Sequence, residues 1–181
     1  MRILAGRWAG RELHSPGGRV RPTAEDVRAA ALQLLGAAVA GARVLDLFAG
    51  TGALGLEALS RGARSCDFVE NDAAALHALK ANVATLRLRG RGRVFVRDAI
   101  PFVARLPAHA YDIAFADPPY GSAKLDRVVA QWAARPFSTR LLIEHDPEHE
   151  LSCAGERRRI RDSALTLLHA PAAGPAMPPP P

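Results

Sequence analysis

The fold is decided by the stretch Asp46-Leu47-Phe48-Ala49-Gly50-Thr51-Gly52, which joins a predicted strand at residues 43–48 to a predicted helix at residues 53–61. Glycines in such a turn let the backbone approach a ligand closely, because they carry no side chain. In open α/β sheets these turns lie at the carboxyl ends of the strands, where ligands bind. The stretch therefore predicts a cofactor-binding edge on an α/β sheet.

Strands and helices alternate after this turn. We place further strands at residues 65–70, 92–97, 111–116 and 139–145, and further helices at residues 72–88, 99–106 and 122–134. An earlier helix is expected to begin after Thr23, its N-cap, and to end at Gly41. The alternation is typical of a parallel, doubly wound sheet. Residues 156–161 and 164–169 break it and predict a terminal antiparallel hairpin.

The two ends of the chain differ from this alternating part. We expect residues 1–22 to form a basic β-hairpin extension and residues 23–169 to form the main domain. The extension holds too few apolar residues for a core of its own, so it must pack on the domain or on a partner. Residues 170–181 are rich in proline and alanine, and they are expected to be a disordered tail.

The charge of the chain points to an anionic partner. The formal net charge is +6, and nearly all of the positive charge comes from arginine. Basic clusters lie within residues 1–22, 87–97 and 157–161, and such clusters suit phosphate backbones. A solvated basic surface is the alternative for the second cluster. No apolar run is long enough to cross a membrane, and two cysteines without framework spacing fit a reducing cytoplasm.

Acidic residues end four successive predicted strands, and they are Asp46, Glu70, Asp98 and Asp117. Asp46 is badly placed for a pyrophosphate but well placed for the amino and sulfonium groups of S-adenosylmethionine. Glu70 can accept hydrogen bonds from ribose hydroxyls, and Asp98 can accept one from the adenine amino group. The competing interpretation is a dinucleotide site, because the glycines at 50, 52 and 55 also match G-x-G-x-x-G.

The stretch Asp117-Pro118-Pro119-Tyr120 predicts where the nucleobase that receives the methyl group is bound. An exocyclic amine on a nucleobase is a poor nucleophile, because its lone pair is delocalised into the ring. If the Asp117 carboxylate and the Pro118 carbonyl accept its two N–H groups, the nitrogen is pushed towards a tetrahedral geometry. Tyr120 would offer a face on which a flipped base can stack. The alternative is a strand that simply ends in a Pro-Pro turn.

Residues 145–149 contain two histidines in a spacing that is known from zinc sites. His145-Asp146-Pro147-Glu148-His149 matches the zinc-protease pattern H-x-x-E-H, which requires a helix to bring both histidines to one face. Pro147 forbids a regular helix there, so no metal site is expected.

Together these motifs closely resemble those of the RsmD family, bacterial methyltransferases that modify guanine N2 in small-subunit ribosomal RNA. The resemblance runs from residue 1 to about residue 169 and rests on a set of short motifs. They are Arg2–Gly6, Gly10–Leu13, Arg21-Pro22-Thr23, Asp46–Gly52, Gly55–Gly62, Glu70 and Asp117–Tyr120. It implies a class I, Rossmann-like α/β fold with a seven-stranded, mostly parallel sheet and a small N-terminal RNA-binding extension. It also implies S-adenosylmethionine as the methyl donor, S-adenosylhomocysteine as the product, and no metal.

The resemblance further implies a target and a set of site residues. The target would be guanine 966 of 16S rRNA in assembled or nearly assembled 30S subunits. Apart from the resemblance, we expect the chain to act as a cytoplasmic monomer. The cofactor would be bound by Asp46, Phe48, Ala49, Gly50, Thr51, Gly52, Glu70, Asn71, Asp98 and Ala99. The base would be held by Asp117, Pro118, Pro119 and Tyr120, and the RNA by Arg7, Trp8, Arg11, Arg21, Thr23 and Arg28.

The chain departs from the family pattern at two places. It has Ala29 where the family has a glutamate after the helix arginine, so a pairing of Arg28 with that glutamate does not transfer. It has Ile160-Arg161-Asp162-Ser163 in place of Tyr-Gly-Asp-Thr. Two other functions stay open: an adenine-N6 methyltransferase of DNA or RNA, which uses a similar tetrapeptide, and a non-catalytic RNA-binding assembly factor on the same fold.

Overall fold

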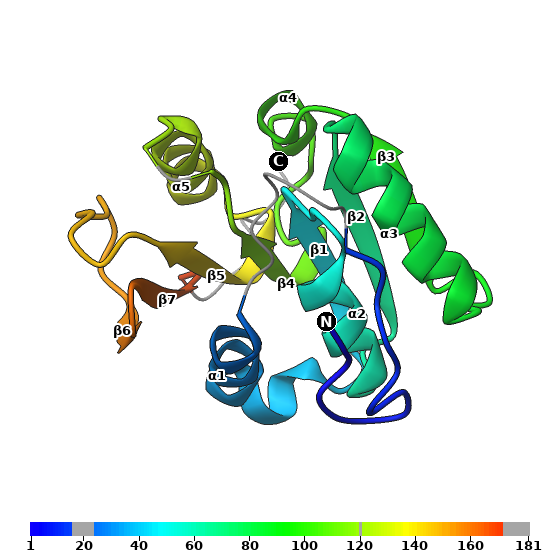
Figure 1. Ribbon diagram of the computed structural model, residues 1–181. Helices are drawn as coiled ribbons and strands as arrows, with labels where there is room; N and C mark the ends of the chain where they lie inside the picture. Colours follow the sequence, from blue (N-terminus) through cyan, green and yellow to red (C-terminus); the bar gives the residue numbers. More distant parts are fainter. Residues whose placement is uncertain (16–23, 120, 172–181) are drawn as a thin grey trace.

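The computed structural model describes residues 1–15, 24–119 and 121–171 (Figure 1). The predictions for Arg21, Thr23, Tyr120 and most of the proline-rich tail fall outside these residues.

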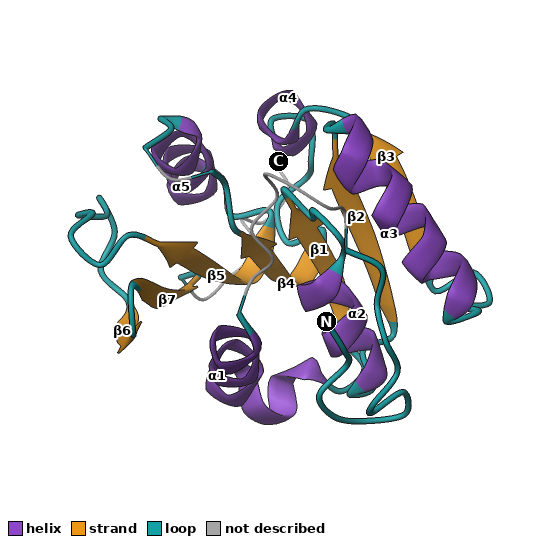
Figure 2. Ribbon diagram, in the orientation of Figure 1, coloured by secondary structure: helices purple, strands orange, loops and turns teal. Residues whose placement is uncertain are grey.

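A mixed sheet forms the centre of the described part (Figure 2). Its strands are β1 (Arg43–Leu47), β2 (Ser65–Glu70), β3 (Gly92–Val96), β4 (Tyr111–Ala116), β5 (Ser138–His145), β6 (Glu156–Ile160) and β7 (Ser163–His169). They form one seven-stranded sheet in the order β3-β2-β1-β4-β5-β7-β6. The first five strands of this order are parallel to one another. β7 runs antiparallel to both β5 and β6. The predicted fold class, including the terminal hairpin, is confirmed.

Helices cover both faces of this sheet (Figure 1). They are α1 (Glu25–Leu35), the 3₁₀ helix η1 (Gly36–Val39), α2 (Ala53–Ser60), α3 (Ala73–Thr85), α4 (Ala99–Val103) and α5 (Lys124–Ala134). Val44 of β1 packs in one core with residues of α1, α2 and α3, while its neighbour Leu45 packs in a second core with residues of α4 and α5. Alternate side chains of a strand point to opposite faces, so the central strands are buried on both sides. In the described part, no helix is long and apolar enough to cross a membrane.

The chain reverses its winding between β1 and β4. These two strands are neighbours in the sheet, although β2 and β3 lie between them in the sequence. The helices that follow them, α2 and α5, lie on opposite faces. The carboxyl ends of β1 and β4 therefore form a topological switch point, which is where open α/β sheets bind ligands.

Three predicted helices end earlier than expected. The first was expected to reach Gly41, but α1 ends at Leu35 because Gly36 takes a positive φ of 51° and the chain continues as η1. α3 ends at Thr85, shortly before Arg87 takes a left-handed φ of 47°. After α4, which ends at Val103, the amides of Arg105 and Leu106 bond only three residues back, which tightens the chain into turns.

The N-terminal extension turns back on itself as the predicted hairpin does, although its paired arms are too short to be drawn as strands (Figure 2). Arg2 and Glu12 form an antiparallel bridge, and backbone hydrogen bonds also join residues 1–3 to residues 10–13. The amides of Leu4 and Ala5 donate to the Glu57 carboxylate of α2, at 2.8 and 3.0 Å. A buried helix side chain therefore fixes the extension to the main domain.

Arg28 belongs to the same buried contact. Its side chain and that of Glu57 are both fully buried, with Nη1 3.7 Å from Glu57 Oε2. Its Nη2 also donates to the Arg2 carbonyl at 3.0 Å. The expectation that Arg28 contacts RNA is wrong for this structure, because its guanidinium has no exposed surface. The glutamate that pairs with Arg28 therefore comes from α2 and not from position 29, which is an alanine.

Candidate active site

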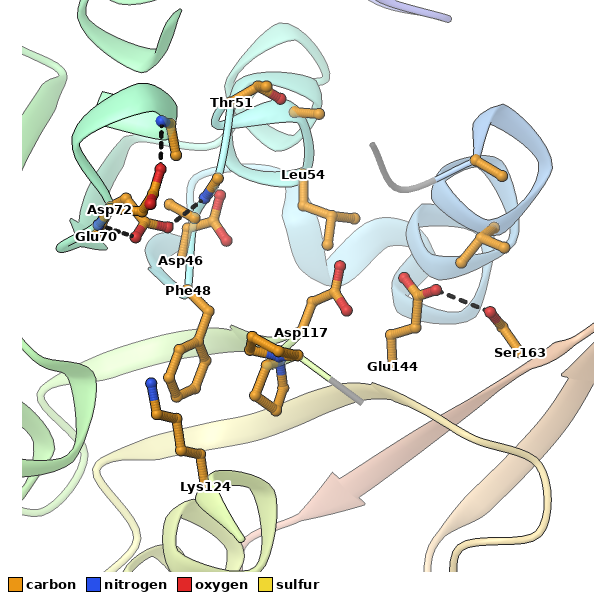
Figure 3. Close-up of a pocket in the computed structure, with 18 of the residues that line it drawn as sticks. Asp46, Phe48, Thr51, Leu54, Glu70, Asp72, Asp117, Lys124, Glu144 and Ser163 are labelled. Carbon is orange, nitrogen blue, oxygen red and sulfur yellow. Dashed lines mark hydrogen bonds between the residues drawn. The ribbon is translucent and has the colours of Figure 1, made fainter. Parts of the chain in front are cut away.

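A cavity of about 700 Å³ lies at the switch point (Figure 3). It is lined by the turn after β1, the ends of β2, β4 and β5, the start of α1 and the turn between β6 and β7. Three of the four predicted strand-end acids line it, and they are Asp46, Glu70 and Asp117. The volume suits a small-molecule ligand site.

Asp46 is the most deeply buried acid of the cavity. Its side chain lies at the end of β1, and its Oδ2 accepts the Gly55 amide at 2.9 Å. Burial raises the pKa of Asp46 to about 8, and the nearby carboxylates of Asp117 and Glu70 push this pKa in the same direction. A Cβ atom at position 55 would lie 2.9 Å from that Oδ2 and 2.5 Å from Cys66 Sγ, so only glycine allows this approach. A positive group in the cavity would stabilise the ionised Asp46 carboxylate.

Glu70 joins two turns. Its Oε2 accepts the amide of Gly50 at 2.8 Å, and its Oε1 accepts the amides of Asn71 and Asp72 at 2.7 and 2.8 Å (Figure 3). Gly50 has a positive φ of 56°, which a residue with a side chain rarely adopts. The Glu70 carboxylate therefore fixes the turn after β1 against the turn after β2. Its expected contact with the ribose stays a prediction.

The other predicted cofactor residues divide into two groups. Phe48, Ala49, Thr51 and Asn71 line the cavity, but Gly52, Asp98 and Ala99 do not. Asp98 caps α4 by accepting the Ile100 amide at 2.8 Å. Gly52 is needed for packing, because a Cβ there would lie 2.5 Å from Leu79 Cδ1. The structure does not bring Asp98 together with the other three acids, so its contact with adenine stays a prediction.

Asp117, the first residue of the tetrapeptide, lies across the cavity from Glu70 (Figure 3). Asp117, Pro118 and Pro119 line the cavity directly after β4, while Tyr120 lies outside the described residues. Phe48 also lines the cavity and has a left-handed φ of 56°, which is uncommon for a residue with a bulky side chain. The Lys124 ammonium lies 5.8 Å from the centre of the Phe48 ring.

Glu144 and Ser163 are among the polar residues that line the cavity but were not predicted from the sequence. Glu144 lies near the end of β5, and its Oε1 accepts the Ser163 hydroxyl at 2.9 Å. A signal was present, because Glu144 is one more acid near a strand end. The predicted strand ran past it to residue 145, so it was counted as part of the strand.

Three of the expected RNA contacts, Arg7, Trp8 and Arg11, lie away from this cavity. Arg7 and Arg11 are exposed on the N-terminal loop, whereas Trp8 is half-buried between the guanidinium groups of Arg7 and Arg91, at 5.8 and 5.3 Å. The Trp8 amide donates to the Ser60 hydroxyl at 3.0 Å, which places it at the carboxyl end of α2. The cavity lies at the other end of that helix.

One buried amide connects the N-terminal loop to the cofactor turn. Asn82 of α3 donates through Nδ2 to the carbonyls of Thr51 and His14, at 2.9 and 3.0 Å. Its Oδ1 accepts the His14 amide at 2.7 Å. Asn82 was not predicted, because its position inside a helix gives no sign of contacts with two distant loops.

The histidine pattern does not form a helix. His145 is the last residue of β5, and its ring nitrogens contact the Asp146 carbonyl and the Thr166 hydroxyl, each at 2.8 Å. Among residues 1–15, 24–119 and 121–171, no group of three histidine, cysteine or acidic side chains could hold a metal ion.

The strand order, and the cavity at the switch point with its strand-end acids, are those of class I methyltransferases. Within that class, the chain belongs to the RsmD family of small-subunit rRNA methyltransferases. The family model described as "Conserved hypothetical protein 95" matches residues 1–161.

Individual relatives agree with this assignment. The chain is 40% identical over 132 residues to "Ribosomal RNA small subunit methyltransferase D" of Escherichia coli K12, covering 71% of this chain and 65% of that protein. It is 36% identical over 157 residues to YlbH of Bacillus subtilis, covering 83% of this chain and 85% of that protein. Among solved structures, it is similar to yhhF of Escherichia coli, with a TM-score of 0.79, 32% identity, and coverage of 92% and 96%.

Proposed function

We propose that this chain transfers a methyl group from S-adenosylmethionine to the exocyclic N2 of a guanine in 16S rRNA. The proposed target is guanine 966, presented by assembled or nearly assembled 30S subunits. The observation that carries the proposal is one cavity that holds Asp46 and Glu70 on one side and Asp117 with Pro118 on the other. The family and the names of its relatives support the class of reaction.

The cofactor side of the cavity fits S-adenosylmethionine better than a dinucleotide. A buried carboxylate whose pKa is raised is a poor neighbour for a pyrophosphate and a good one for an ammonium group. Asp46 would hold the positive end of the ligand, and Glu70 would face the ribose. When bound, S-adenosylmethionine supplies a methyl group on a positively charged sulfur. No metal is required for this transfer.

The base side of the cavity supplies hydrogen-bond acceptors to the amine. The Asp117 carboxylate would accept one N–H of guanine N2, and the Pro118 carbonyl would accept the other. Proline has no backbone N–H, so neither Pro118 nor Pro119 offers a backbone donor that could compete with the base amine for these acceptors. Asp117 would also balance the positive charge that develops on the nitrogen in the transition state. Stacking on Tyr120 remains part of the proposal.

RNA binding would extend well beyond the cavity. Arg7 and Arg11 are exposed at one end of α2, and Arg157, Arg158 and Arg159 are exposed on the edge strand β6. Arginines spread in this way suit the phosphates that flank a flipped nucleotide, rather than the base itself.

One assay separates this function from the two alternatives. The purified chain is incubated with tritiated S-adenosylmethionine and one of three substrates: 30S subunits that lack the modification, naked 16S rRNA, or DNA. Tritium is expected in N2-methylguanine of the 30S subunits. Tritium in N6-methyladenine would support the adenine methyltransferase instead. Binding to subunits without any transfer would support the assembly factor and overturn the proposal.

A further inference from the structure

Glu144 stands level with Asp117 on the neighbouring strand. β4 and β5 pair in parallel, with Ala116 opposite Ile143, so Asp117 and Glu144 are the next residues of the two strands. Both line the same cavity, and Figure 3 shows their carboxylates side by side below Leu54. Any group that Asp117 holds therefore has the Glu144 carboxylate as a neighbour.

Glu144 is held in place from a third strand. The residue is only 9% exposed, and the Ser163 hydroxyl at the start of β7 donates to its Oε1 at 2.9 Å. β7 pairs with β5 in the antiparallel direction, with Glu144 opposite Leu165. A carboxylate oriented by a hydroxyl donor is presented as a hydrogen-bond acceptor.

Two neighbouring carboxylates, those of Asp117 and Glu144, can distinguish one nucleobase from another by the donors that each base presents. Guanine presents two kinds of donor next to each other on its Watson–Crick edge, the N1–H and the N2 amine. Adenine and cytosine present an amine next to a ring nitrogen that carries a lone pair. A carboxylate facing that lone pair would repel it, so adjacent carboxylates match guanine alone among bases that carry an exocyclic amine.

We infer that Glu144 is a specificity-determining residue that accepts the N1–H of guanine while Asp117 holds the N2 amine. The inference rests on the proposed function and deepens it, because it gives the physical reason why guanine is chosen over adenine. Ser163 is then a positioning residue, because its hydroxyl orients the Glu144 carboxylate.

The test replaces the target guanine with 2-aminopurine. This base keeps the N2 amine but has a lone pair at N1 in place of the N–H. Target sites containing either base are placed in 16S rRNA by ligation, and the rRNA is assembled into subunits. The value of kcat/KM for methyl transfer is measured with the wild type and with E144Q. The matched control is E148Q, which removes the same charge from a side chain that is 81% exposed and paired with Arg159.

We expect the wild type to methylate guanine at least about 100-fold more efficiently than 2-aminopurine, because the buried acceptor is left facing a lone pair. In E144Q this ratio should fall by at least about tenfold, since the amide can donate to N1 of 2-aminopurine. E148Q should keep the wild-type ratio. S163A should lower the ratio by a smaller factor. Calorimetry with S-adenosylhomocysteine should give the same Kd for E144Q and wild type, which shows that the variant folds.

The outcomes are distinct. Equal transfer to guanine and 2-aminopurine by the wild type would overturn the inference, even if E144Q does not fold. A ratio that is the same in wild type and folded E144Q would also overturn it, while transfer to guanine leaves the proposed function intact. If the wild type transfers nothing to guanine, the proposed function fails and the inference fails with it.

Discussion

The two sides of the cavity hold their carboxylates in different ways. On the cofactor side, backbone amides donate to Asp46 and Glu70, one to the former and three to the latter. On the base side, Glu144 accepts a side-chain hydroxyl, and Asp117 is followed by two residues that have no amide hydrogen. The first set of donors is fixed by turns of the backbone, whereas a hydroxyl can rotate.

This difference indicates that backbone amides hold the acids of the cofactor side in place before any ligand arrives, whereas a side-chain hydroxyl orients Glu144 on the base side. Substitutions on the cofactor side should therefore change ligand affinity and stability together. Substitutions on the base side should change the rate of transfer and leave cofactor affinity nearly unchanged. Four predictions test this division, in order of decreasing effect.

The largest effect is expected from D117A. Without this carboxylate, the amine of the base loses an acceptor and the transition state loses the charge that balances it. We expect kcat to fall by at least about 10³-fold, while the Kd for S-adenosylhomocysteine changes by less than about threefold. Single-turnover transfer and calorimetry measure the two quantities. Retained turnover would refute the role of Asp117, and a large loss of cofactor affinity would refute the division between the two sides.

The next effect is expected from E70Q. The amide of glutamine keeps the shape of the side chain but removes the charge that three backbone N–H groups share, and it turns an NH₂ group towards one set of donors. Hydrogen bonds to a charged group contribute about 1.5–3 kcal/mol, so affinity for S-adenosylhomocysteine should fall by about ten- to one-hundredfold and the melting temperature should drop. E150Q changes an exposed glutamate and is the control. An unchanged melting temperature would show that Glu70 does not organise the two turns.

A third prediction concerns pH. The pKa of Asp46 is raised to about 8 in the folded protein, so the folded state binds a proton that the unfolded state releases near pH 4. The free energy of unfolding of the cofactor-free protein should therefore contain a contribution that is lost as the pH rises towards 8. A ligand ammonium near Asp46 lowers this pKa, so binding should release a proton.

The affinity for S-adenosylhomocysteine should accordingly rise with pH between about 6 and 7.5, by up to about tenfold per pH unit. Calorimetry in buffers with different ionisation enthalpies measures the protons released. D46N should bind more weakly and should lose this pH dependence in the same range. Proton uptake on binding would contradict the assignment of Asp46 to the positive end of the ligand.

The sequence predicted what depends on local pattern. The strands and the acids at their ends were found because alternation and strand-end position leave a signal within a few residues. The contacts of Glu57 and Asn82 were not predicted, because both residues lie within helices and bond backbone groups that are distant in the sequence. Glu57 bonds Leu4, 53 residues away, and Asn82 bonds His14 and Thr51, 68 and 31 residues away. Contacts of this kind leave no periodic pattern in the sequence. Glu144 was missed because a polar residue within a predicted strand looks the same whether it faces a cavity or solvent.

The smallest effect is expected outside the cavity, at Arg11. This arginine is exposed on the N-terminal loop, and its proposed partner is an RNA phosphate. R11Q should weaken binding to 30S subunits only a few-fold and should reduce the slope of log K against log salt concentration by about one, because one fewer counterion is released. R127Q is the control, because Arg127 is also exposed but lies on α5, which packs on the opposite face of the sheet. If R11Q changes the Kd for S-adenosylhomocysteine as much as it changes RNA binding, the loop acts on the cofactor side through Asn82 and Thr51, and the role of Arg11 is not limited to an RNA phosphate.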